Sequence, residues 1–206
     1  MDNHRKRIQY LKESGLKLNK VLDIGAYSGE WSLLLKEFYP EADILMIDAN
    51  EEKEEDLKKI GKYKIALLGS ENNKEVDYYK CKDGIPTGNG IYKENSQFTF
   101  EPVKRKTTTL STLLGSDKGF DLIKMDVQGS ELDIIKGSLP IIKNTNVLLL
   151  ELQTIQFNQG APSASEVISY LYQNGFELVD IFNLMYATND LIQVDTLFIN
   201  KNRNDS

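Results

Sequence analysis

Short apolar segments alternate with amphipathic segments along most of the chain. Runs typical of buried strands predict strands at residues 20–26, 43–48, 63–69, 120–126 and 146–152. Apolar positions at helical spacing predict helices at residues 5–18, 29–39, 51–59, 130–143 and 163–174. Because strands and helices alternate, we expect an α/β fold, doubly wound, with a mostly parallel sheet and helices on both faces.

Two regions break this alternation. The final strands, predicted at 176–182 and 192–199, have no helix between them, which predicts an antiparallel hairpin at one edge of the sheet. The middle of the chain holds an alternating strand at 75–81, a glycine-rich stretch from 83 to 100, a strand at 101–110 and a short helix at 111–115. The glycine-rich stretch is either a flexible loop or a pair of irregular strands. We expect a single domain over 1–206, with an N-terminal helix in 1–18, an inserted region at 71–106 near the site, and a frayed tail at 201–206.

Composition narrows the possible partners. The chain has 206 residues, 40% of them hydrophobic, and a formal net charge of -6. An acidic chain is a poor general partner for nucleic acid or an anionic membrane, so we expect neither. No apolar run reaches the roughly 18 residues that a membrane span needs, and the charged N-terminus lacks the apolar core of a secretory signal. We therefore expect a cytoplasmic protein whose lone histidine, His4, lies exposed in a frayed terminus.

The segment Val21–Ser32 (VLDIGAYSGEWS) carries the most specific candidate chemistry. It reads as a buried strand, a glycine turn from Gly25 to Gly29, and the start of a helix. Glycines allow a sharp turn and a close ligand approach. The N–H groups at a helix start are expected to face whatever binds in that turn. This pattern predicts a site for a nucleotide-type cofactor.

Four acidic residues follow or end predicted strands: Asp23, Asp48, Asp126 and Glu151. Ligands of open α/β sheets bind beyond the carboxyl ends of the strands, where these side chains should gather. Asp23 is expected to support the cofactor turn, although a satisfied structural acid is the alternative. Asp48 is placed to bind ribose hydroxyls, or else to begin the next helix. Asp126 and Glu151 have either a site role or a role in turns and caps.

The glycine pattern excludes several nucleotides. The dinucleotide fingerprint G-x-G-x-x-G is absent, and bulky Tyr27 stands where a second glycine would admit a pyrophosphate. The phosphate-loop pattern G-x-x-x-x-G-K-[ST] is also absent. A ligand with adenosine but no phosphates, such as S-adenosylmethionine, fits this turn better.

Three motifs together resemble the FkbM-type family of S-adenosylmethionine-dependent methyltransferases. They are Asp23–Gly29 (DIGAYSG), Lys124–Glu131 (KMDVQGSE) with the following Ile135–Gly137 (IKG), and the apolar strand from Leu148 that ends at Glu151. The resemblance implies a seven-stranded Rossmann-like sheet with an antiparallel last strand. It also implies S-adenosylmethionine as cofactor and methyl transfer, typically to oxygen of a sugar, glycolipid or polyketide. The predicted cofactor-binding residues are Asp23, Gly25, Ala26, Tyr27, Ser28, Gly29, Asp48, Ala49 and Asp126.

The chain departs from the family pattern at two places in the predicted site. Tyr27 stands where the family usually has asparagine, and Asp48-Ala49 stands where Glu-Pro is common. The second change keeps a carboxylate, so ribose binding is expected to survive. The first could change how the turn holds the methionine part of the cofactor.

A hydroxyl acceptor must lose its proton during methyl transfer, so the site needs a base. Asp126 is the first candidate and Glu151 the second, with Lys124 placed to pair with an acid or orient the acceptor. No metal site is predicted. Residues 84–103, with Tyr92, Phe98 and Phe100, are expected to recognise a small-molecule or glycan acceptor, or to form a loop without a role. The alternatives are an NAD-dependent Rossmann oxidoreductase and a non-catalytic cofactor-binding module of the same fold; the oligomeric state stays open.

Overall fold

The computed structural model describes residues 2–84, 86–115 and 119–202. Its main sheet has seven strands in the order β3-β2-β1-β6-β7-β9-β8. All neighbours pair in parallel except β9, which runs antiparallel to both β7 and β8. The predicted Rossmann-like fold class and the edge hairpin are therefore confirmed. The strands are Lys20–Ile24 (β1), Asp43–Asp48 (β2), Lys62–Ile65 (β3), Leu122–Met125 (β6), Val147–Gln153 (β7), Phe176–Ala187 (β8) and Asp190–Asn200 (β9).

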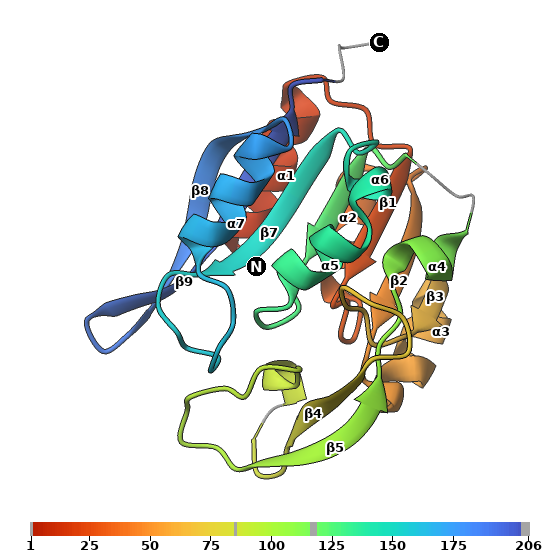
Figure 1. The fold of residues 1–206 in the computed structure, drawn as a ribbon. Helices are drawn as coiled ribbons and strands as arrows, with labels where there is room; N and C mark the ends of the chain where they lie inside the picture. Colours follow the sequence, from red (N-terminus) through yellow and green to blue (C-terminus); the bar gives the residue numbers. More distant parts are fainter. Residues whose placement is uncertain (1, 85, 116–118, 203–206) are drawn as a thin grey trace.

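Helices cover both faces of this sheet (Figure 1). One buried cluster joins the sheet to α4, α5, α6 and α7, and a second joins the opposite face to α1, α2 and α3. Side chains alternate between the two faces along each strand, so Ile123 lies in the first cluster and Leu122 in the second. The helices are Asp2–Glu13 (α1), Glu30–Phe38 (α2), Glu54–Ile60 (α3), Leu110–Leu114 (α4), Glu131–Gly137 (α5), Leu139–Ile142 (α6) and Ala164–Gln173 (α7), with 3-10 turns at Glu51–Lys53 (η1) and Pro86–Gly88 (η2).

Several predicted boundaries differ from the structure. The helix expected at 130–143 is two helices, because the backbone leaves the helical region at Ser138, where φ is -140°. The strand expected at 63–69 ends at Ile65. The first helix begins and ends earlier than predicted. Across the described residues, no helix has the length and apolarity needed to cross a bilayer.

The prediction for His4 is wrong. Its side chain is 14% exposed and its Nε2 lies 3.0 Å from Oδ2 of Asp195 on β9. At the other end of the chain, residues 203–206 of the predicted frayed tail lie outside the described residues. Lys201 and Asn202 are held, because their N–H groups donate to the Gly175 carbonyl and to Asn200 Oδ1.

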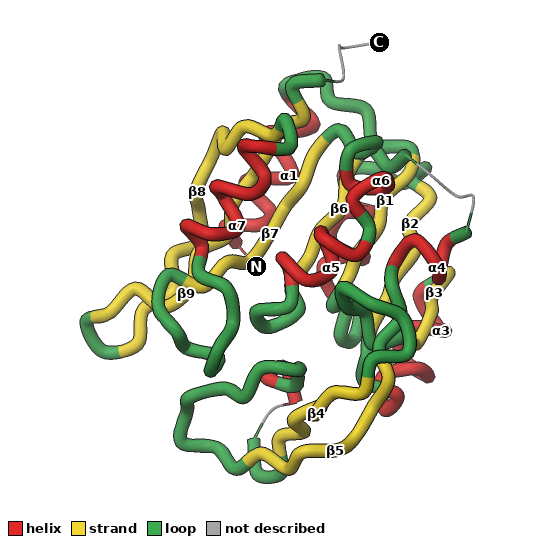
Figure 2. The backbone as a smooth tube through the Cα atoms, viewed as in Figure 1, coloured by secondary structure: helices red, strands yellow, loops and turns green. Residues whose placement is uncertain are grey.

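A small two-stranded ribbon lies beyond the carboxyl ends of the parallel strands (Figure 1). It pairs Glu75–Cys81 (β4) with Phe100–Lys106 (β5) in antiparallel register. The stretch between these strands is mostly loop, as Figure 2 shows, with a single turn of helix at η2. It is anchored at two points, by bridges between Tyr79 and Gly90 and between Glu94 and Asn158. The inserted region is thus positioned against the sheet edge where the predicted site residues lie.

Candidate functional site

A cavity of about 260 Å³ opens between the inserted region and the ends of β1, β2, β6 and β7. Six of the predicted site residues line it: Gly25, Tyr27, Asp48, Ala49, Asp126 and Glu151. The other four, Asp23, Ala26, Ser28 and Gly29, are not in its wall. The sheet therefore brings acids from three strand ends together with the glycine turn, as the sequence predicted, but it places Asp23 beneath the turn.

The turn after β1 is fixed by backbone contacts with its neighbours. The N–H groups of Gly25 and Ala26 donate to the Ile47 carbonyl, at 2.8 and 3.2 Å. Gly25 has a φ of +75°, and a Cβ there would lie 1.7 Å from the Asp126 carbonyl oxygen. Only glycine fits this position. The N–H groups of Gly25 and Ala26 are thus already paired within the protein, and the expectation for the N–H groups at the helix start stays a prediction.

Asp48 and Asn50 form the polar wall of the cavity beside β2. Asp48 Oδ2 accepts from the Tyr27 N–H at 2.6 Å, and its Oδ1 accepts from the Asn50 N–H at 2.7 Å. Burial raises the pKa of Asp48, while these two N–H donors lower it, and burial prevails. Asn50 Oδ1 caps η1, but its buried Nδ2 has no partner among the described residues.

This pair of side chains suits a ribose. A vicinal diol both donates and accepts hydrogen bonds. Each Asp48 oxygen can accept a second hydrogen bond, and the Asn50 amide offers an unused donor on the same wall. The unpaired Nδ2 group of Asn50 is therefore a physical reason to expect a polar ligand here. No site role was predicted for Asn50; its position two residues after Asp48 was the available signal.

Tyr27 adopts a backbone conformation that tyrosine rarely takes, with a φ of +50°. Its ring lies 4.0 Å from the Lys53 ammonium, measured to the ring centroid. The substitution of asparagine by tyrosine is thus accommodated by a cation–π contact with η1.

Lys124 links buried Asp23 to Asp126 beneath the cavity. Its Nζ lies 3.3 Å from Asp23 Oδ1 and 3.5 Å from Asp126 Oδ2, and it donates to the Gly25 carbonyl at 3.1 Å. Burial alone lowers the pKa of Lys124, but the neighbouring carboxylates, led by Asp23 and Asp126, outweigh burial and raise it. Asp23 is fully buried and also accepts from Ser32 Oγ at 2.7 Å. The pairing expected for Lys124 is confirmed, and it holds the glycine turn to β6.

Glu151 has a different environment from Asp126. Gln128 Nε2 donates to Asp126 Oδ1 and to Glu151 Oε1, both at 3.2 Å, and Gln193 Nε2 donates to Glu151 Oε1 at 2.9 Å. Both donors reach the same oxygen of Glu151, and within the described part of the chain no donor reaches Oε2. Burial raises the pKa of Glu151 well above its usual range, and the carboxylates of Asp126 and Asp195 raise it further.

The inserted region closes the cavity from below. Tyr78 on β4 is buried in the wall, and the Arg105 guanidinium lies 4.8 Å from the centre of its ring. Arg105 Nη1 also donates to the Ala49 carbonyl, which fixes β5 to the end of β2. Sequence reasoning missed Tyr78 and Gln193, since nothing local to them indicates a site. Gln128 lies within the Lys124–Glu131 motif, which was the available signal, but no role was predicted for it.

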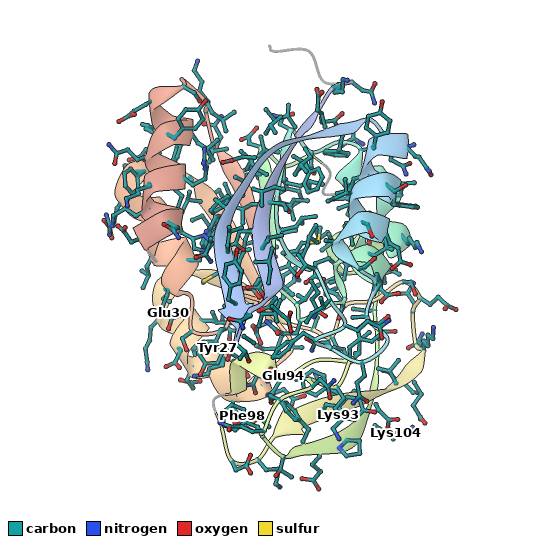
Figure 3. All side chains as sticks on the ribbon, turned by 90° about the vertical axis from the view of Figure 1, so that its left-hand side faces the viewer. Tyr27, Glu30, Lys93, Glu94, Phe98 and Lys104 are labelled. Carbon is teal, nitrogen blue, oxygen red and sulfur yellow. The ribbon has the colours of Figure 1, made fainter. Side chains whose placement is uncertain are left out.

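The predicted acceptor segment is only partly at the cavity. Thr87, Asn89, Gly90 and Ile91 line it, together with Met185 from the β8–β9 hairpin, whereas Tyr92, Phe98 and Phe100 do not. Figure 3 shows the labelled loop residues Lys93, Glu94 and Phe98 at the same end of the molecule as Tyr27. In the described ranges, no group of three or more potential metal-binding side chains was found.

Comparisons with known proteins agree with this geometry. The family described as Methyltransferase FkbM domain matches residues 23–178. A search of curated proteins found no match to the chain.

Solved structures with a similar fold include three methyltransferases. Ribosomal protein L11 methylase from Lactobacillus delbrueckii subsp. bulgaricus is 17% identical, with 96% of this chain and 79% of that chain covered and a TM-score of 0.51. An S-adenosylmethionine-dependent methyltransferase from Clostridium acetobutylicum ATCC 824 is 10% identical, with 95% and 89% covered and a TM-score of 0.54. Magnesium protoporphyrin IX methyltransferase from Synechocystis PCC 6803, with bound SAH, is 12% identical, with 95% and 81% covered and a TM-score of 0.55. At these identities the likeness is one of fold.

Proposed function

Since the chain belongs to the family of FkbM methyltransferase domains and is an S-adenosylmethionine-dependent methyltransferase, we propose that it methylates a hydroxyl oxygen of a sugar, glycolipid or polyketide-like small molecule. The observation that supports an oxygen acceptor is the carboxyl of Glu151. It lies in the cavity wall, and its environment makes it an unusually strong base for a carboxylate. An acceptor hydroxyl needs such a group to take its proton.

The residues of the cavity wall fit the cofactor. When bound, S-adenosylmethionine supplies a methyl group on an electrophilic sulfonium. Asp48 and the unpartnered amide of Asn50 would bind the ribose hydroxyls. Gly25, which has no side chain, leaves space in the wall at the end of β1. Leu67 and Leu68 offer an apolar surface for the adenine ring of the cofactor.

Glu151 is better suited than Asp126 to act as the base. Asp126 already pairs through Oδ2 with the Lys124 ammonium, and its Oδ1 accepts from Gln128 Nε2, so both of its oxygens are engaged. Glu151 has like charges around it and an oxygen, Oε2, that no described donor occupies. In the proposed reaction, the acceptor oxygen gains the methyl group and its proton passes to Glu151 Oε2. Asp126 would then orient the site through Gln128, which contacts both carboxylates.

Calorimetry tests the cofactor assignment first. S-adenosylmethionine and S-adenosylhomocysteine should bind, NAD should not, and Asp48→Ala should weaken binding by about tenfold or more, the equivalent of a lost charged hydrogen bond. Glu101→Ala is a matched control, because this exposed acid on β5 pairs with Lys82 away from the cavity. Absence of binding at millimolar cofactor would overturn the assignment.

Turnover against a panel of hydroxyl-bearing sugars, glycolipids and polyketides tests the reaction. Glu151→Gln should lower S-adenosylhomocysteine formation by about 10²–10⁴-fold, the usual contribution of a general base, while leaving cofactor affinity nearly unchanged. A protein that binds the cofactor but turns over no acceptor would support the alternative of a non-catalytic module. Family membership already favours methyl transfer over the NAD-dependent alternative.

A further inference from the structure

Half-buried Glu151 and buried Asp195 face each other across the last parallel strand and its antiparallel neighbour. Glu151 on β7 is directly opposite Asp195 on β9. Leu149 and Leu197, two residues before and after them, pack in the cluster beneath α1 and α2, so both acids point to that face. Directly opposed residues have Cβ atoms about 4.5–5.5 Å apart. Like charges at that distance repel strongly inside a protein.

The N-terminal helix places a histidine, which is a cation when protonated, at this position. His4 Nε2 lies 3.0 Å from Asp195 Oδ2, and Asp195 itself is only 3% exposed. The imidazole ring stands edge-on to Phe182, with the ring centroids 5.7 Å apart. Asn183 Nδ2 also donates to Asp195 Oδ2, at 2.6 Å, but it carries no charge.

The other basic residues at the start of α1 are paired with different acids. Arg5 pairs with Glu37 on α2, Lys6 with Asp2 on α1 itself, and Arg7 with Asp180 on β8. Among the described residues, His4 is therefore the basic side chain that forms an ion pair with Asp195.

We propose that His4 is a positioning residue for the site: its imidazolium neutralises Asp195 and so allows Glu151, the base in the proposed function, to ionise. The inference rests on that function only for the role of Glu151. The charge coupling itself does not depend on it. It makes the N-terminal helix, which is far from Glu151 in sequence, part of the charge balance at the site.

The remaining charges around Glu151 do not provide this compensation. From β6, Asp126 repels the Glu151 carboxylate and Lys124 attracts it. From α5, Glu131 adds a further like charge. Lys124 is already shared between Asp23 and Asp126. Without the imidazolium, Asp195 would add an uncompensated negative charge, which favours protonated Glu151.

The titration of Glu151 can be measured without cofactor or acceptor. Carbon-13 NMR of glutamate-labelled protein follows each side-chain carboxyl with pH, and Glu151→Gln identifies the signal. His4→Gln should move the midpoint of this titration upward by about 0.5–1 pH unit, the effect of losing one nearby cation. Arg5→Gln is the matched control, since it removes a cation one residue away whose partner, Glu37, is on the surface. It should leave the midpoint unchanged.

A double variant shows whether His4 acts through Asp195. His4→Gln combined with Asp195→Asn removes both members of the ion pair and should return the midpoint close to that of the unmodified protein. A merely structural role for His4 predicts no such reversal. An unchanged midpoint in His4→Gln, or no reversal in the double variant, would overturn the proposal. If His4→Gln alone does not fold, the double variant still tests the proposal. The proposal requires the Glu151 midpoint of the double variant to lie near that of the unmodified protein.

These outcomes are separate from those of the proposed function. Failure of cofactor binding or turnover would leave the charge coupling measurable. Failure of the coupling would leave Glu151 as the proposed base with a different source of compensation.

Discussion

Gly25 and Gly29 belong to the same turn and both have a positive φ, but different atoms surround them. A Cβ on Gly25 would meet the backbone oxygen of Asp126 at 1.7 Å, whereas one on Gly29 would meet the flexible end of the Ile60 side chain at 2.4 Å. Gly160 also has a positive φ, of +79°, but a Cβ at this position would have no neighbouring atom within 4 Å. Comparing substitutions at the three positions therefore distinguishes the cost of a positive φ from the cost of steric overlap.

We expect alanine substitutions to destabilise the protein in the order Gly25, Gly29, Gly160. Gly160→Ala should cost about 1–2 kcal/mol, the penalty of the left-handed conformation alone. Gly25→Ala should cost at least about 3–5 kcal/mol, because β1 and the end of β6 must also move apart. Urea unfolding of the three variants measures this. Equal costs would mean that the turn can relax away from Asp126.

At the scale of elements, one buried side chain holds the inserted region against the main sheet. Asn158, in the loop between β7 and α7, is fully buried and exchanges two hydrogen bonds with Gln153. Its Nδ2 also donates to the Tyr92 carbonyl at 3.0 Å, and the Tyr92 hydroxyl donates to Asp133 on α5. This amide therefore links three elements that are distant in sequence, and it holds the loop that contributes Gly90 and Ile91 to the cavity.

Replacing Asn158 by alanine should free this loop. The change leaves buried groups of Gln153 and Tyr92 without partners, which costs about 1–3 kcal/mol for each group left unsatisfied. Amide hydrogen exchange in residues 90–95 should become faster. Gln159→Ala is the control, because that neighbouring side chain bonds only the exposed Asn95. Equal exchange in the two variants would show that the strand bridge between Glu94 and Asn158 is sufficient by itself.

The pH dependence of global stability is a property of the whole molecule, since it compares the folded with the unfolded chain. Burial raises the pKa of Glu131 to about 7, although the N–H groups of Val127 and Gly129 that bond its carboxylate lower it. An acid with a raised pKa binds its proton more tightly when folded. Its contribution to stability is therefore fully present below pH 4.5 and is lost as the pH rises through about 7.

Glu131→Gln should remove most of this dependence. The amide oxygen can still accept from both N–H groups, but no charge forms as the pH rises. Relative to the unmodified protein, the variant should gain about 2–3 kcal/mol between pH 5 and pH 8, as measured by urea unfolding at both values. Glu166→Gln is a useful comparison, because this exposed capping residue on α7 has a lowered pKa and should show no such gain. If Glu131→Gln lost as much stability between pH 5 and pH 8 as the unmodified protein does, the assignment to Glu131 would be contradicted.

Much of the fold and part of the site follow from local sequence. Apolar runs and helical spacing are local properties, so they placed strands such as Asp43–Asp48 and Glu75–Cys81 at the predicted residues. The missing glycine at Tyr27 indicated the cofactor class, and the acids Asp48, Asp126 and Glu151 indicated part of the cavity wall. These signals are readable because parallel strands bring their carboxyl ends to one edge whatever the details of packing.

Tertiary structure decided the properties that depend on contacts between distant segments. The sequence could not show that Lys124 pairs with Asp126, or that Glu151 lies opposite Asp195. Nor could it place His4, nearly two hundred residues before Asp195, in contact with that acid. The strength of a base depends on burial and on the charges within a few ångströms, and only the folded chain fixes both. The sequence by itself therefore determined the fold class and the end of the sheet where the cofactor site is predicted. The packing of β7, β9 and α1 decided the contacts of Glu151 and Asp195, on which our proposal for the base rests.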